Sequence, residues 1–83
     1  KRVALQSEII LMAELIKEAA YKQIDRMKEA MDRGKTEEAD KIQSDIRRLV
    51  SHLRSGKYVS VFEGCAGGIE LKLNESVAGT SNQ

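Results

Sequence analysis

A tight turn is encoded by Asp32-Arg33-Gly34-Lys35-Thr36-Glu37-Glu38-Ala39, a polar stretch that interrupts an apolar stripe repeating at helical spacing on both sides. Gly34 tolerates the left-handed backbone that often ends a helix, and Thr36 is a favourable N-cap for a helix that follows. The acidic residues after Thr36 suit the positive end of that helix's dipole. A connection this short predicts two helices that pack antiparallel.

Both helices are predicted from the spacing of their apolar side chains. The first is expected over residues 4–33 and the second over residues 37–54. The stripe of the first helix consists of Leu5, Ile9, Ala13, Ile16, Ala20, Ile24, Met27 and Met31. The stripe of the second consists of Ala39, Ile42, Ile46, Leu49, Val50 and Leu53. Met12 lies beside the first stripe, and we expect it to fill the core.

After Gly56 the apolar spacing changes to an alternation of two residues, which is typical of strands. Two strands are expected over residues 58–63 and 69–74, joined by a glycine-rich turn. The predicted fold class is therefore α+β, an antiparallel two-helix hairpin followed by a C-terminal two-stranded β-hairpin. These elements form a single domain over residues 1–74, and residues 75–83 are expected to be a disordered tail.

The first helix is expected to outreach the second by about ten residues at its amino end, because the two lengths are roughly 45 and 28 Å. Apolar residues in this end lie on more than one side of the helix, so the β-hairpin or a second chain has to cover them. We expect a homodimer. The expected protein interface consists of Leu5, Ile10, Leu11, Leu15, Tyr58 and Phe62.

The second helix is the basic part of the chain, since residues 41–57 carry five basic side chains and one acidic side chain. Arg47, Arg48 and Arg54 are candidate contacts to a nucleic-acid backbone. A helical projection separates them, because Arg48 falls on the back of the helix near Asp45 while the other two line the apolar stripe. A solvated helix face is the favoured interpretation, and nucleic-acid binding is the alternative.

Motifs for catalysis, for metal binding and for cofactor binding are missing from the sequence. Cys65 lies among glycines, but the sequence places no base near it, since His52 is the only histidine. We therefore expect neither enzymatic activity nor a cofactor. A lone cysteine cannot form an intramolecular disulfide and favours a reducing compartment, and no apolar run reaches the roughly 20 residues that span a bilayer. The sequence predicts a small cytoplasmic accessory or regulatory factor, of bacterial or phage type, that self-associates and binds an unidentified protein.

Overall fold

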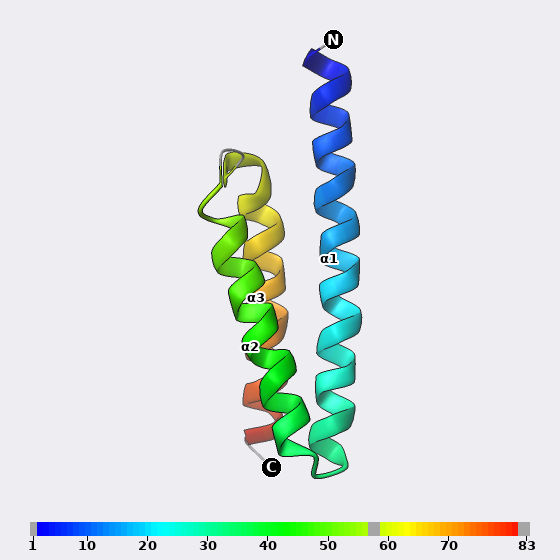
Figure 1. Ribbon diagram of the computed structural model, residues 1–83, viewed down its shortest axis with the longest axis vertical. Helices are drawn as coiled ribbons and strands as arrows, with labels where there is room; N and C mark the ends of the chain where they lie inside the picture. Colours follow the sequence, from blue (N-terminus) through cyan, green and yellow to red (C-terminus); the bar gives the residue numbers. More distant parts are fainter. Residues whose placement is uncertain (1, 57–58, 82–83) are drawn as a thin grey trace.

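The computed structural model describes the backbone of residues 2–56 and 59–81 and the side chains of residues 7–56 and 60–78. These residues form three α-helices, which are α1 (Arg2–Asp32), α2 (Thr36–Leu53) and α3 (Val59–Ser81). Figure 1 shows that α2 runs antiparallel to α1 and that α3 returns alongside both, parallel to α1. The result is a rod-shaped three-helix bundle of 50 × 18 × 18 Å.

The predicted helical hairpin is confirmed, and Gly34 ends α1 as expected. Gly34 has a φ of +76°, in the left-handed region that favours glycine. Its N–H donates to the carbonyl of Met31 and the N–H of Lys35 donates to the carbonyl of Ala30, which together form a Schellman motif. The predicted N-cap is wrong, because Thr36 is already helical and Lys35, which makes no side-chain cap hydrogen bond, occupies the cap position.

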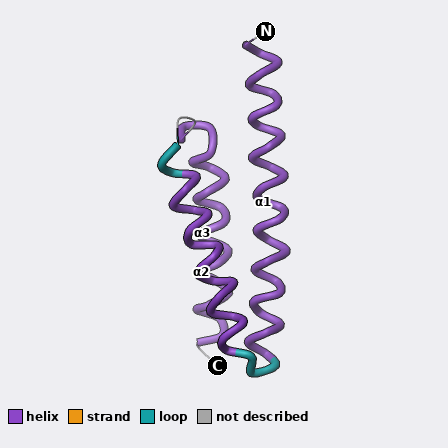
Figure 2. Tube along the Cα trace, in the orientation of Figure 1, coloured by secondary structure: helices purple, strands orange, loops and turns teal. Residues whose placement is uncertain are grey.

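The predicted α+β fold class is wrong, because α3 takes the place of the whole β-hairpin. Residues 59–63 and 69–74 are helical, and no strand occurs in residues 2–56 or 59–81 (Figure 2). The expected turn at residues 64–68 lies within α3 as well. The expected disordered tail, residues 75–83, continues this helix as far as Ser81, and residues 82–83 lie outside the described residues.

The helical form of α3 follows from a second apolar spacing in the same residues. Phe62, Cys65, Ile69, Leu73 and Ser76 recur every three or four residues, Ala66 lies beside Cys65 on the same face, and all six are buried or half-buried. Leu71, in contrast, is 60% exposed, because it is two positions from both Ile69 and Leu73, and residues two positions apart in a helix lie about 200° apart around its axis. Burial of this face between α1 and α2 outweighs the low helix propensity of the glycines in α3, about 1 kcal/mol each. An isolated two-stranded hairpin would bury far less.

The core lies where the three helices meet, around the fully buried side chains Ile24, Met27, Ile69 and Leu73. The contribution of α2 consists of Ala39, Ile46, Val50 and Leu53. Five of the buried residues are alanines, whose small side chains let the helix backbones approach closely. They are Ala13, Ala20, Ala30, Ala39 and Ala66. The amino end of α1 extends beyond both α2 and α3 (Figure 1). The amino-terminal end of α1 therefore lacks the flanking helices that cover the rest of it (Figure 1).

Candidate interaction surface

One side of α1 carries large apolar side chains that face away from the core. Leu11, Met12 and Leu15 are 58%, 53% and 57% exposed. Around the axis of α1, these three side chains span an arc of about 100°. We call the exposed residues within this arc the outer face of α1. Over residues 8–22 it consists of Glu8, Leu11, Met12, Leu15, Ala19 and Lys22. The core side of the same helix, with Ile9, Ala13 and Ala20, is buried.

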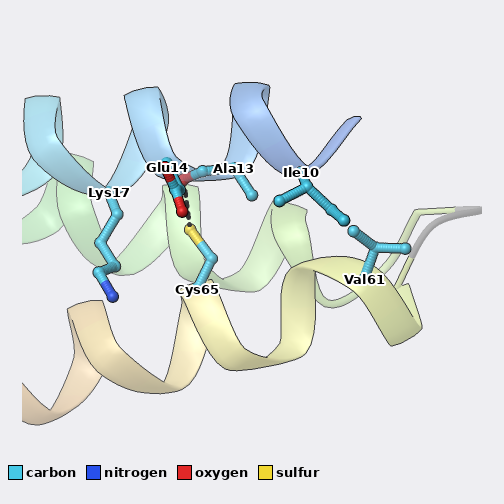
Figure 3. A pocket seen from close by; sticks show the side chains of 6 residues that line it. All are labelled: Ile10, Ala13, Glu14, Lys17, Val61 and Cys65. Atoms are coloured by element: carbon cyan, nitrogen blue, oxygen red, sulfur yellow. Dashed lines mark hydrogen bonds between the residues drawn. The ribbon is translucent and has the colours of Figure 1, made fainter. Parts of the chain in front are cut away.

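The opposite flank of α1 meets the first turns of α3. The thiol of Cys65 points at α1 and donates a hydrogen bond to the main-chain carbonyl of Ala13, with an Sγ to O distance of 3.3 Å (Figure 3). Beside this contact is an open cavity of about 130 Å³. It is lined by Ile10, Ala13, Glu14, Lys17, Val61 and Cys65. Ile10 therefore lies at the rim of this cavity and not on the outer face of α1.

Lys17 and Tyr21 of α1 continue this contact with α3. The Tyr21 ring has two ammonium groups near it, Lys17 Nζ at 5.9 Å from the ring centroid and Lys72 Nζ at 5.2 Å. A Cβ added to Gly68 would lie 3.4 Å from the Tyr21 hydroxyl, so the Tyr21 side chain reaches the backbone of α3 at Gly68. The aromatic ring and the two lysines thus pack α1 against α3 on the carboxyl-terminal side of the cavity along α1.

Cys65 has the features of a structural thiol. Its side chain is 7% exposed, and burial raises its pKa, while the positive charge of Lys17 partly opposes that rise. A raised pKa keeps the thiol protonated near neutral pH, and the thiolate is the nucleophilic form. His52 lines a different hollow on α2, together with Asp45, Arg48 and Leu49. No group of three histidine, cysteine or acidic residues with metal-binding geometry occurs in the part of the chain that the structure describes.

The residues expected at a protein interface do not all lie together. Leu11 and Leu15 share the outer face of α1, whereas Phe62 is half-buried and packs against the hydrophobic core. The side chain of Leu5 and the whole of Tyr58 lie outside the described residues. Met12, which was expected in the core, is exposed beside Leu15. Its spacing of three residues from Leu15 was visible in the sequence and is the signal that could have found it.

The three arginines that were candidate nucleic-acid contacts are separated as well. Arg54 binds two carboxylates of α3, Glu70 at 2.8 Å and Glu63 at 3.5 Å, and the hydrogen bond to Glu70 is the main reason that the pKa of Arg54 is raised. Arg47 donates to the Asn74 side chain of α3 at 3.4 Å. Arg48 lies at the separate hollow near His52. Two of the three guanidinium groups thus join α2 to α3, and this geometry favours a structural role for them.

Comparison of the chain with protein-family models, with curated proteins and with solved structures found no match. Among the helical residues that the structure describes, no segment combines the length and the apolar character that crossing a membrane requires.

Proposed function

We propose that this chain is a non-enzymatic protein-interaction module that self-associates through the outer face of α1. The observation that carries the proposal is the group of Leu11, Met12 and Leu15, each more than half exposed on one side of a 31-residue helix. Contiguous exposed apolar side chains are uncommon on monomeric proteins and mark interaction sites. Their burial against an apolar partner surface would supply the free energy of association, at about 25 cal/mol per Å².

The proposed partner is a second copy of the same chain. A stable interface buries about 800 Å² on each partner, more than three side chains supply, so the contact has to continue along α1. The outer face offers this continuation, because Ala19 and Lys22 extend it towards the middle of the helix. Two copies of one long helix match in length, and closed two-fold dimers are the commonest symmetric assemblies. A reducing, cytoplasmic setting is part of the proposal, because the lone Cys65 is free and buried.

The proposal is tested by the double substitution Leu11→Glu and Leu15→Glu. Carboxylates at these positions would be desolvated in the interface, so the variant is expected to be monomeric at concentrations where the wild-type chain has twice its mass of 9.3 kDa. Helix content is expected to stay the same, because both side chains point away from the core. Sedimentation equilibrium gives the mass and circular dichroism gives the helix content.

Leu71→Glu is the matched control, since Leu71 is as exposed as Leu11 and Leu15 but lies on α3. This variant is expected to dimerise like the wild-type chain. A wild-type chain that remains a monomer at the highest concentration measured would contradict the proposal. So would a double variant that dimerises as tightly as the wild-type chain.

A further inference from the structure

We infer that the two copies pair their α1 helices antiparallel about Leu15, so that Glu8 of each copy lies against Lys22 of the other. This inference rests on the proposed self-association and specifies its geometry. The argument starts from the positions of three residues, each seven residues from the next: Glu8, Leu15 and Lys22. Seven residues are nearly two helical turns, so the three side chains lie almost on one line along α1, about 10 Å apart.

The two charged residues of this line have no partner within the described chain. Glu8 and Lys22 are both exposed, and neither takes part in any of the ion pairs that the described residues form. An apolar residue thus lies midway between a free carboxylate and a free ammonium group. Two-fold rotation about Leu15 places each carboxylate opposite the other copy's ammonium group, and two ion pairs form for each dimer.

The charges also discriminate against the parallel arrangement. Parallel copies in the same register would set Glu8 beside Glu8 and Lys22 beside Lys22, which places like charges together at both ends of the apolar contact. Juxtaposed like charges disfavour association, and opposite charges set the register of an interface. The charges along this line of residues are therefore complementary between antiparallel copies of α1 and repulsive between parallel copies.

Met12 and Ala19 of the outer face fit the same arrangement. Reversal of the second helix brings the long side chain of Met12 against Ala19 of the other copy, because the two positions are three and four residues from Leu15 on the same side of the line. A small residue opposite a long one lets two helices approach closely. The outer face is exposed and the core side of α1 is buried, so the rest of the two bundles lies on opposite sides of the paired helices.

Disulfide trapping tests the orientation directly. In a Cys65→Ser background, which keeps a donor for the Ala13 carbonyl, one chain carries Glu8→Cys and a second chain, distinguished by mass, carries Lys22→Cys. The antiparallel pairing predicts that mild oxidation yields the mixed disulfide in excess over either homodimer, because a disulfide needs Cα atoms within about 7 Å. Leu71→Cys in the same background measures the cross-linking that results from random collision.

The outcomes separate this inference from the proposed function. Homodimeric disulfides through residue 8 and through residue 22, without the mixed species, would show a parallel dimer and overturn the inference alone. A dimer mass without cross-linking above the Leu71→Cys control would also overturn it, because residues 8 and 22 would then lie apart. A monomer mass for the unmodified chain would overturn both.

Charge reversal gives a second, equilibrium test. Glu8→Lys and Lys22→Glu are each expected to raise the dissociation constant of the dimer roughly threefold to tenfold, because two ion pairs become two repulsive pairs. The double variant restores both pairs and is expected to return to within about twofold of the wild-type value. In a parallel dimer the single reversals would exchange one like-charge pair for another, so an unchanged dissociation constant would contradict the antiparallel arrangement.

Discussion

The chemistry of Cys65 is determined by its burial against α1. Glycines surround it in the sequence, which predicted a turn between two strands at this position. In the structure these residues belong to α3, and the thiol is buried and donates to the carbonyl of Ala13. Burial disfavours the charged thiolate, so the pKa of Cys65 is raised. Cys65 therefore packs α3 against α1 and is shielded from solvent.

At the residue scale we expect Cys65 to alkylate more slowly than a free peptide cysteine near neutral pH. The folded thiol has a higher pKa than the unfolded one, so its contribution to stability is complete below the unfolded pKa and is lost as pH rises through the folded pKa. Iodoacetamide labelling of folded and urea-unfolded protein measures the first effect. Urea unfolding of the wild-type chain and of Cys65→Ser between neutral and alkaline pH measures the second, and equal slopes in the two proteins would contradict it.

At the scale of single elements, α3 is the helix with the least favourable composition. Gly64, Gly67 and Gly68 lie in its first half, and each costs up to about 1 kcal/mol relative to alanine in a helix. The three glycines differ in what an added methyl group would contact, and none of these contacts is closer than ordinary van der Waals distance. At Gly68 the added Cβ would lie 3.4 Å from the Tyr21 hydroxyl, whereas at Gly64 nothing lies within 4 Å.

We therefore expect Gly64→Ala to stabilise the protein by about 0.5–1 kcal/mol, because alanine gains helix propensity without a new contact. Gly68→Ala is the matched comparison and is expected to gain a similar amount, since its methyl group would make an ordinary van der Waals contact with the Tyr21 hydroxyl. Urea unfolding followed by circular dichroism gives both free energies. A clear destabilisation by Gly64→Ala would indicate a turn with a left-handed glycine at this position and would contradict the helical assignment.

At the scale of the whole molecule, the bundle combines a fully buried core with one long, partly uncovered helix. Ile69 and Leu73 of α3 are fully buried between α1 and α2, and Leu71, between them in the chain, is exposed. On one face of a strand, all three side chains would share a single environment. The different burial of Leu71 and Leu73 is thus a direct signature of the three-helix packing.

Leu73→Ala is expected to destabilise the protein by about 2–5 kcal/mol, because it leaves a cavity where the three helices meet. Leu71→Ala is expected to change stability by no more than about 0.5 kcal/mol, because its side chain is mostly in solvent. Urea unfolding at equal protein concentration compares the two variants. Similar losses for both would place the two leucines in one environment and contradict the fold.

The first two helices could be predicted because local interactions encode them. Residues 4–33 and 37–54 were expected to be helical, and the bounds of α1 and α2 match these ranges to within two residues. The expected N-cap, Thr36, is wrong, because Lys35 occupies the cap position. The candidate surface was predicted in part. Leu11 and Leu15 lie off the apolar stripe and were expected at an interface, whereas Met12 lies beside the stripe, was expected in the core and is 53% exposed.

Residues 59–81 could not be assigned from the sequence because they satisfy two periods. Ile69, Leu71 and Leu73 alternate as in a strand, and Ile69, Leu73 and Ser76 repeat as in a helix. Glycine-rich composition weighed locally against the helix. The apolar surface formed by α1 and α2 decides between them, because it accepts one helical face and buries Ile69 and Leu73 completely.

The sequence by itself determined the turn at Gly34, the two helices that flank it and the excess length of the first, all of which depend on neighbours within a few residues. The tertiary structure alone decided the helical form of α3, the burial of Cys65 and the partial burial of Phe62. These properties depend on which surfaces meet in space, and the free energy of burying apolar area between distant segments exceeds the local preferences that the sequence displays.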